Sequence, residues 1–199
     1  MNKDFKKLQV VERIKKKNKI AAIKCMKDFD IVLDYADDLA AAFLLMGNIS
    51  NIKRYVDAIQ NKGLPVFIHI EKVGGLALNN EGVEFISSIV KPVGIITTKP
   101  NLIKKAQTHG LMAIQRVFMI DTEVFENTLN LKEHRPDIIE IMPSPLYHII
   151  SELTSRIEIP IITGGLIHST DDMKKSLNAG AIAVSTSNNK VWRENVNLN

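Results

Sequence analysis

The sequence predicts an α/β fold, a minimal (β/α)8 barrel of the TIM type with an added basic helix at its amino terminus. Eight short runs of aliphatic and β-branched residues recur along the 199 residues, and a segment with helical periodicity follows each run. Runs this apolar are typical of a parallel sheet whose faces are covered by helices. Eight strands close such a sheet into a barrel with no exposed edge, whereas an open doubly wound sheet is the alternative.

The expected strands follow one another at a steady spacing. They comprise residues 20–24, 39–45, 64–70, 93–98, 111–117, 138–142, 159–163 and 181–185. Among the helices between them, the segment "NIKRYVDAIQNKG" places Ile52, Val56 and Ile59 on one face and ends at Gly63. The segment "KPNLIKKAQTHG" ends in the same way at Gly110.

Another helix is expected before the first strand. Phe5, Leu8 and Val11 are spaced three apart, so we expect them to form the apolar face of a helix that caps or flanks the barrel floor.

Length and composition favour one domain, residues 1–199, in the cytoplasm. Hydrophobic residues make up 45% of the chain, and no Pro-, Gly- or Ser-rich linker divides it. The longest apolar run, residues 39–46, is less than half of a membrane span, and the lysine-rich start lacks a signal-peptide core, so we expect no membrane partner. Cys25 is the single cysteine, and we expect it to be a small buried residue without a disulfide or a zinc ion.

The positive charge is concentrated at the amino terminus. Residues 1–19 hold eight Lys and Arg against two acids, which gives +6; because the whole chain carries +4, the rest carries −2. Lys15, Lys16 and Lys17 are therefore candidate contacts to the phosphates of RNA, although a lysine run also occurs on solvated helix faces.

The stretch "IPIITGGLIHSTDD" suggests a phosphate site. Gly164 and Gly165 follow the seventh expected strand, and paired glycines leave backbone N–H groups open to the close approach of an anion. A tight turn without a ligand is the other interpretation. In a (β/α)8 barrel, phosphate often lies at the loops after strands seven and eight, and Ser185 and Thr186 end the eighth strand with hydroxyl groups. These four residues predict a phosphate-binding site.

Polar side chains also end other strands. The guanidinium of Arg116 lies in an apolar strand and needs an anionic partner, either Glu140 or the oxygens of a ligand. Lys99 precedes Pro100 at a helix start, where it is either a second anion contact or a surface lysine. His69 is more typical of a hydrogen-bonded barrel histidine than of a catalyst.

An enzyme is the alternative class. Glu71 and Glu140 form a candidate acid–base pair for a sugar-phosphate isomerase. The sequence shows no metal-ligand spacing, no nucleophile flanked by a base and no dinucleotide glycine fingerprint, so we assign no catalytic residue, metal or cofactor.

Several phrases of the sequence resemble one family in the same order. They are "AAFLLMGNISNI", "VFIHIEKVGGL", "GIITTKPNLIKKAQTHGLMAIQRVFMIDT", "PDIIEIMP", "IPIITGGLI" and "LNAGAIAVSTSNNKVW". The chain resembles, over residues 20–192, the glycerol-3-phosphate-responsive antiterminators of bacterial glycerol uptake operons. The resemblance implies a non-enzymatic regulator that binds glycerol 3-phosphate and the leader of an mRNA and prevents premature termination of transcription.

The resemblance also implies the site. Its matching positions are Gly164, Gly165, Ser185 and Thr186 on the phosphate side and Lys99, Gln115, Arg116 and Glu140 at the polar mouth. The sequence departs from the family pattern at Asn48, where an acidic residue is usual, and at Glu71, where a shorter acid is usual. RNA binding by such a chain relies on phosphate contacts, because aromatic residues are few, and we expect Trp192 to anchor the last helix.

Overall fold

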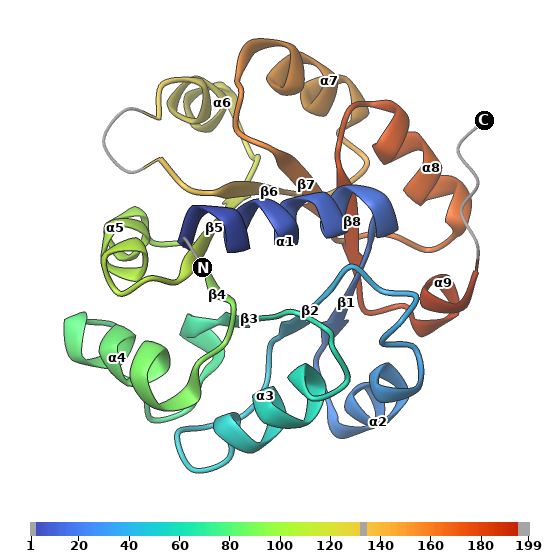
Figure 1. Ribbon diagram of the computed structural model, residues 1–199. Helices are drawn as coiled ribbons and strands as arrows, with labels where there is room; N and C mark the ends of the chain where they lie inside the picture. Colours follow the sequence, from blue (N-terminus) through green and yellow to red (C-terminus); the bar gives the residue numbers. More distant parts are fainter. Residues whose placement is uncertain (1–2, 132–134, 195–199) are drawn as a thin grey trace.

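The computed structural model describes residues 3–131 and 135–194, whose strands form a closed barrel of eight parallel strands. The strands follow chain order around the barrel, and β1 (Lys19–Ile23) pairs with β8 (Ala183–Thr186) to close it (Figure 1). The (β/α)8 prediction is confirmed, and an open sheet is excluded because the closing pair is present.

The remaining strands lie within two residues of the expected starts. They are β2 (Ala41–Leu44), β3 (Val66–His69), β4 (Gly94–Thr97), β5 (Met112–Phe118), β6 (Ile138–Met142) and β7 (Ile161–Gly164). Two of them begin directly after a proline, Pro65 or Pro160, where the sequence analysis had placed strand. Proline has no N–H to donate to a ladder, so hydrogen-bonded strand begins only at the following residue.

The helices alternate with the strands and surround the barrel (Figure 1). They are α1 (Lys3–Lys17), α2 (Met26–Asp34), α3 (Ile52–Gln60), α4 (Asn80–Phe85), α5 (Pro100–Thr108), α6 (Thr122–Leu129), α7 (Tyr147–Arg156), α8 (Thr170–Asn178) and α9 (Asn189–Arg193). A 3-10 turn, η1 (Ile70–Lys72), follows β3, and a π-helical turn, η2 (Ile86–Val90), extends α4.

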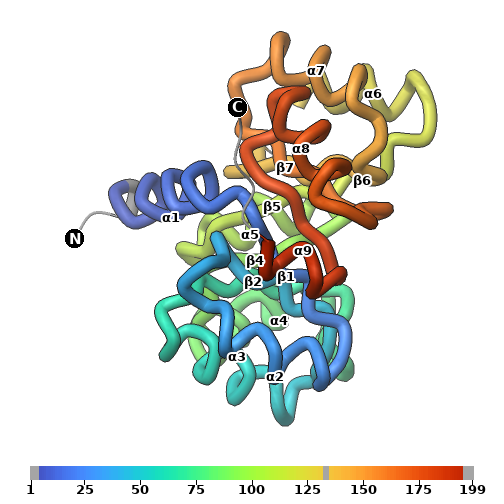
Figure 2. The backbone as a smooth tube through the Cα atoms, turned by 90° about the vertical axis from the view of Figure 1, so that its right-hand side faces the viewer, coloured from blue at the N-terminus to red at the C-terminus, as the bar shows by residue number. Residues whose placement is uncertain are grey.

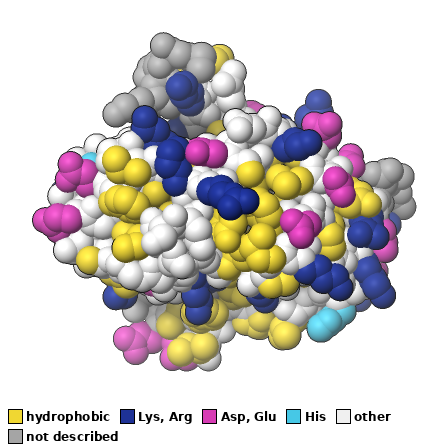
Figure 3. Space-filling view, turned by 90° about the horizontal axis from the view of Figure 1, so that it is seen from below, with side chains coloured by type: hydrophobic (Ala, Val, Ile, Leu, Met, Phe, Trp, Pro, Cys, Tyr) yellow, Lys and Arg dark blue, Asp and Glu magenta, His cyan; other side chains and the backbone are white. Residues whose placement is uncertain are grey.

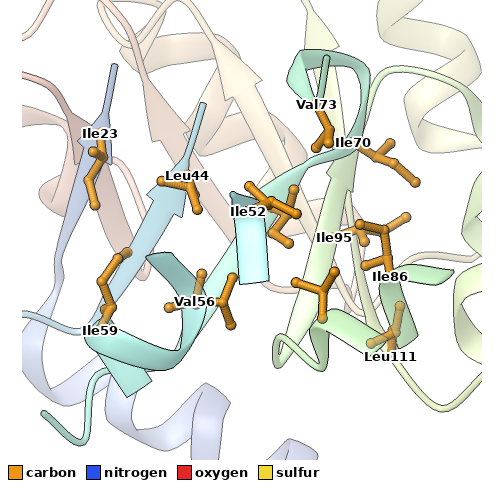
Figure 4. Packing of buried hydrophobic residues seen from close by; sticks show 14 of the residues in the cluster. Ile23, Leu44, Ile52, Val56, Ile59, Ile70, Val73, Ile86, Ile95 and Leu111 are labelled. Atoms are coloured by element: carbon orange, nitrogen blue, oxygen red, sulfur yellow. The ribbon is translucent and has the colours of Figure 1, made fainter. Parts of the chain in front are cut away.

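Two apolar layers hold the barrel together. Inside it, the rings of Phe43 and Phe67 meet edge to face with their centroids 5.9 Å apart, and both side chains are fully buried. Outside it, Ile52, Val56 and Ile59 of α3 turn toward the strands, as Figure 4 shows. The predicted apolar face of this helix is confirmed.

The amino-terminal helix α1 lies across one end of the barrel (Figures 1 and 2). Arg13 fixes it there, since its guanidinium donates to the backbone oxygens of Ala36, Leu39 and Ala40 at 3.0–3.1 Å. Lys7 adds an ion pair with Asp137 at 2.7 Å. These partners all precede strands, so α1 covers the floor of the barrel, as expected.

The expected apolar face of α1 is right only for Val11, which packs against the buried cluster that contains Ile14. Phe5 and Leu8 are 51% and 62% exposed, whereas Ile14 is fully buried and Val10 packs against the same cluster. The helix is rotated about its axis relative to the expectation. Residues spaced by four lie on one helical face, and the contacts of Arg13 hold the face that includes Val10 and Ile14 against the floor.

A second expectation about burial is also wrong. Cys25 is exposed, because it lies at the start of α2 at the barrel mouth, with its Sγ 3.4 Å from Asp28 Oδ2. Trp192, in contrast, is fully buried and anchors α9 as predicted.

Candidate functional site

A cavity of about 420 Å³ opens at the carboxyl ends of the strands. Its lining residues are Ala22, Lys24, Leu45, Arg116, Met142, Gly165, Leu166, Ile167, His168, Ser185, Thr186, Ser187 and Asn188. They come from strands on opposite sides of the barrel and from the loops after β7 and β8, where barrels of this type bind ligands. The cavity is therefore the candidate ligand site.

Four of the predicted site residues line this cavity. They are Arg116, Gly165, Ser185 and Thr186. Two more lie directly behind them, because Glu140 contacts Arg116 and Ser185, and Gly164 packs against Ser185.

Arg116, Glu140 and Ser185 form a buried network. Arg116 Nε donates to Glu140 Oε2 at 2.6 Å, and Ser185 Oγ donates to Glu140 Oε1 at 2.6 Å. Glu140 is fully buried, so its charge requires both partners. The terminal nitrogens of Arg116 make no hydrogen bond to the described part of the chain, and Arg116 lines the cavity, which leaves them available to an anionic ligand.

Gly164 has a packing role in this network. A Cβ at residue 164 would lie 2.2 Å from Ser185 Oγ and 3.0 Å from Glu140 Oε1. Only glycine lets Ser185 reach Glu140, so the first of the paired glycines shapes the network.

Gly165 and Leu166 form the strained part of the loop after β7. Both have positive φ, +77° and +58°, and for leucine this conformation costs about 1 kcal/mol or more. Among the described residues, the backbone N–H groups of Gly165, Leu166 and Ile167 have no acceptor. Because all three residues line the cavity, these donors are available to a phosphate.

The helix after this loop is capped by its own side chains. Ser169 and Asp172 form a capping box, with Ser169 Oγ accepting from the Asp172 N–H at 3.2 Å. The pKa of Asp172 is lowered, first by the backbone N–H of His168 and then by Ser169. The carboxylate is thus used within the helix cap.

The loop after β8 connects the cavity to α9. Thr186 Oγ1 accepts from the Asn188 N–H at 3.0 Å, and Asn188 Nδ2 donates to His168 O, which joins the two phosphate-side loops. Trp192 Nε1 donates to Thr186 O at 2.8 Å. A movement of the Thr186 backbone would therefore alter the hydrogen bond of the buried indole of Trp192.

The charges of the cavity favour an anion. Lys24 and Arg116 line it and no carboxylate does. Glu140 balances Arg116 from behind, so Lys24 supplies the net positive charge, and it has no ion-pair partner within the described residues. Lys24 was not among the predicted site residues, although it ends the first expected strand, where a side chain can reach a ligand at the barrel mouth.

Lys99 and Gln115 do not line this cavity. Gln115 precedes Arg116 on β5, and neighbouring residues of a strand face opposite sides, so Gln115 faces the helix layer. Its buried Oε1 has no partner among the described residues. Lys99 is exposed at the start of α5.

A second polar cluster lies where β3 and β4 end. Glu71 Oε1 accepts from Thr97 Oγ1 and the Thr98 N–H, each at 2.7 Å, and Glu71 Oε2 lies 3.0 Å from His69 Nδ1. Burial acts to raise the pKa of Glu71, but the hydrogen bonds from His69, Thr97 and Thr98 together outweigh it and lower the pKa to about 2. Glu71 is therefore an ionised structural group at neutral pH.

The lysines predicted to contact RNA lie at the opposite end of the barrel. Lys15, Lys16 and Lys17 form the last turn of α1, on the floor. Lys15 pairs with Glu12 of the same helix at 2.9 Å, and the side chains of Lys15 and Lys16 are exposed. The cavity lies at the carboxyl ends of the strands, whereas the basic helix α1 lies at the other end of the barrel, on the left in Figure 2.

The described residues contain neither a candidate metal centre nor a helix that could span a membrane. No group of three His, Cys, Asp or Glu within residues 3–131 and 135–194 is placed to hold a metal ion. In the same ranges, none of the helices has the length and apolar character that crossing a membrane requires.

The chain has relatives among known proteins. The chain is 32% identical over 174 residues to an Escherichia coli K12 protein described as "Uncharacterized protein YgcP", with 87% of this chain and 90% of that protein covered. It is similar to the crystal structure of the glycerol uptake operon antiterminator regulatory protein from Listeria monocytogenes, with a TM-score of 0.84 and 32% identity over 89% of this chain and 96% of that one.

More distant structures share the fold alone. A glycerol uptake operon antiterminator-related protein from Thermotoga maritima matches with a TM-score of 0.77 and 24% identity, covering 89% of this chain and 98% of that one. The N-acetylmannosamine-6-phosphate 2-epimerase from Clostridium perfringens matches with a TM-score of 0.67 and 13% identity, covering 88% and 87%.

The family match covers the barrel and the cavity together. The model of the family described as "Glycerol-3-phosphate responsive antiterminator" matches residues 19–192, from the first residue of β1 to the buried tryptophan of α9. The chain therefore belongs to the glycerol-3-phosphate responsive antiterminator family.

Proposed function

We propose that this protein is an RNA-binding transcription antiterminator that binds glycerol 3-phosphate in the mouth cavity and the leader mRNA of glycerol utilisation genes. The observation that carries the ligand part is the cavity itself, which is lined both by Arg116, whose terminal nitrogens have no partner in the described residues, and by residues 165–167, whose backbone N–H groups have no acceptor there. Such donors suit a phosphate, and Lys24 adds the charge that a dianion favours.

The glycerol part of the effector fits the remaining lining. Ser187 and Asn188 offer polar groups in the loop after β8, whereas Leu45 and Met142 offer apolar surface at the ends of β2 and β6. A small polyol phosphate needs both, because its hydroxyl groups require hydrogen-bond partners when its carbon chain is buried.

A regulator is favoured over an isomerase by the state of the two carboxylates. Both oxygens of Glu140 accept hydrogen bonds from protein groups, and Glu71 is held ionised with a pKa of about 2. A general acid–base catalyst needs a pKa near the working pH and access to the substrate proton. The pKa of Glu71 fails the first requirement, and Glu140, fully buried with both oxygens hydrogen-bonded, fails the second, so we propose no catalytic role for them.

The RNA part of the proposal is supported by charge. Lys15, Lys16 and Lys17 form an exposed cationic turn on α1, whereas the side of the molecule shown in Figure 3 has Lys and Arg interspersed with Asp and Glu. Contacts between Lys or Arg side chains and phosphates supply much of the affinity of proteins for RNA, and this turn offers three lysines in a row.

Calorimetric titration tests the ligand part. We expect saturable binding of glycerol 3-phosphate and much weaker binding of glycerol and of inorganic phosphate, since each lacks half of the contacts. Incubation with triose and pentose phosphates should give no product. Turnover that disappears in Glu140→Gln would overturn the regulator in favour of the isomerase.

Transcription of a leader template tests the RNA part. We expect read-through of the terminator to rise only when protein and glycerol 3-phosphate are both present. Read-through that is unaffected by the protein would reject the antiterminator proposal even if the ligand binds.

A further inference from the structure

A second cavity, of about 630 Å³, lies between α1 and the barrel floor. Its walls come from α1 and from the segments that precede β3, β4 and β5. We call it the floor groove and define it by Lys6, Val10, Gln60, Pro65, Lys91 and Pro92. It is at the opposite end of the barrel from the mouth cavity, so the effector proposed above does not account for it.

The floor groove has an excess of positive charge. No Asp or Glu lines it. Two of its cations are used by the fold, because Lys7 pairs with Asp137 and Arg13 donates to three backbone oxygens. Lys6 and Lys91 are exposed and have no ion-pair partner in the part of the chain that the structure describes. These two ammonium groups are available to an anionic ligand.

The interior of the groove combines apolar walls with one unused acceptor. Val10, Pro65 and Pro92 supply apolar surface. Gln60 Nε2 donates to Lys91 O at 3.1 Å, but the buried Gln60 Oε1 has no partner within the described residues. A buried amide oxygen without a donor costs about 1–3 kcal/mol. Gln60 Oε1 is closed off from solvent, so a ligand N–H recovers this free energy when the Gln60 side chain turns its amide into the groove.

We propose that the floor groove receives one unstacked nucleobase of single-stranded RNA. The base lies between the apolar walls and donates an N–H to Gln60 Oε1, and Lys6 and Lys91 neutralise the phosphates on either side of it. This inference rests on the proposed RNA binding and assigns it a position. Proteins that bind single-stranded RNA commonly hold splayed bases in this way.

Charge selects RNA over a second copy of this chain as the occupant. The exposed Phe5 and Leu8 lie on α1, beside the groove, and are among the exposed apolar side chains that a second copy could offer to it. The same helix also carries Lys15, Lys16 and Lys17, so docking it would bring like charges together. Such contacts cost free energy, whereas an RNA strand is attracted to both the groove and the helix.

Two variants separate the two parts of the proposal. In Lys6→Gln/Lys91→Gln, we expect the affinity for a leader RNA, measured by fluorescence anisotropy, to fall at least tenfold. The slope of log affinity against log salt should flatten by about 1.4, which is 0.7 for each lost phosphate contact. The control variant Lys104→Gln/Lys105→Gln removes the same amount of charge from α5. Its RNA affinity and salt slope should equal those of the wild type within experimental error.

The second variant, Gln60→Met, keeps the shape and charge of the groove and removes the acceptor. We expect the salt slope to stay at the wild-type value, while the difference in affinity among oligo(A), oligo(C), oligo(G) and oligo(U) shrinks at least threefold. Melting temperatures measured in parallel verify that each variant is folded.

The outcomes distinguish this inference from the proposed function. Wild-type protein that binds no RNA would reject the proposed function. Wild-type binding that both groove variants retain, while Lys15→Gln/Lys16→Gln/Lys17→Gln loses it, would reject the floor groove alone. A sedimentation coefficient that changes in the groove variants without any change in RNA affinity would identify a second copy as the occupant and also reject the inference.

Discussion

Arg116 Nε lies 2.6 Å from Glu140 Oε2, and the two side chains are 7% and 0% exposed. The pair joins neighbouring strands, since Arg116 of β5 is in register with Glu140 of β6. One edge of the guanidinium thus satisfies a buried carboxylate, while the other edge faces the cavity. Arg116 therefore stabilises the fold and is also placed to contact a ligand.

Arg116→Met is expected to affect both properties. It leaves Glu140 buried without its cation, which should destabilise the fold by about 3–5 kcal/mol. In the double variant Arg116→Met/Glu140→Gln, a neutral amide replaces the orphaned charge and most of the stability should return. Binding of glycerol 3-phosphate should stay weaker by about 2 kcal/mol or more in the double variant. Denaturant unfolding and calorimetry measure the two effects, and wild-type affinity in the double variant would assign Arg116 to structure alone.

Gly165→Ala is expected to weaken phosphate binding at least tenfold. Gly165 has φ +77°, and an added Cβ would lie 2.9 Å from Cε of Met142, a side chain that lines the cavity and would have to move. Gly63→Ala is the matched control, because Gly63 has φ +74° and no atom within 4 Å of its added Cβ. Both variants should lose about 1 kcal/mol of stability from backbone strain. Equal ligand affinity of the two variants would contradict the role of Gly165.

Glu71 is expected to make the fold sensitive to acid. Its pKa is lowered from 4.5 to about 2 in the folded protein, so the carboxylate stabilises the fold fully above its ordinary value. As the pH falls from about 4.5 to about 2, roughly 3 kcal/mol of this stabilisation should be lost. Glu71→Gln should flatten the loss over that window, whereas Glu126→Gln, at an exposed position, should not. The midpoints of denaturant unfolding should be measured from pH 6 to pH 2 for the wild type, Glu71→Gln and Glu126→Gln. Midpoints that fall in parallel in all three proteins would contradict this role of Glu71.

Trp192 is expected to report ligand binding. It is the single tryptophan of the chain, and its Nε1 donates to the backbone oxygen of Thr186, which lines the cavity. Titration with glycerol 3-phosphate should shift the emission of this buried indole until the site is saturated. In Gly165→Ala, the starting spectrum should match the wild type and the shift should need a higher concentration. An emission spectrum that stays constant while calorimetry detects binding would show that the loop after β8 does not respond.

The three lysines at the end of α1 are expected to contribute to RNA binding through charge alone. Lys15→Gln/Lys16→Gln/Lys17→Gln should flatten the salt dependence by about 0.7 per lost contact, with a similar loss for all RNA sequences. A scrambled leader RNA serves as the comparison. Lost discrimination between the two RNAs would mean that these lysines read bases, and an unchanged slope would mean that they form only a solvated helix face.

The sequence was sufficient for the barrel and for part of the site. Buried parallel strands are apolar on both faces, so runs such as residues 138–142 are visible without a structure. The loops after β7 and β8 were found because glycines and hydroxyl groups at strand ends have a known use. In contrast, Gln115 and Arg116 are adjacent in the sequence, and only the inward direction of Arg116 in the barrel separates them.

The floor end of the molecule was predicted less well. The rotation of α1 depends on the contacts of Arg13 with backbone oxygens, which no side-chain pattern records. The floor groove joins α1 to three segments far along the chain, and the orphaned oxygen of Gln60 appears only when these segments meet. Long-range contacts of this kind leave no periodic signal.

The pairing of β1 with β8 makes completion of the fold depend on the eighth strand. Lys19 is in register with Val184, and its amine donates to the backbone oxygens of Trp192 and Glu194 at 3.0 and 2.9 Å. A growing polypeptide that lacks β8 has two open sheet edges and lacks the wall of the cavity that Ser185 and Thr186 supply. Until β8 is made, the nascent chain is therefore prone to aggregation.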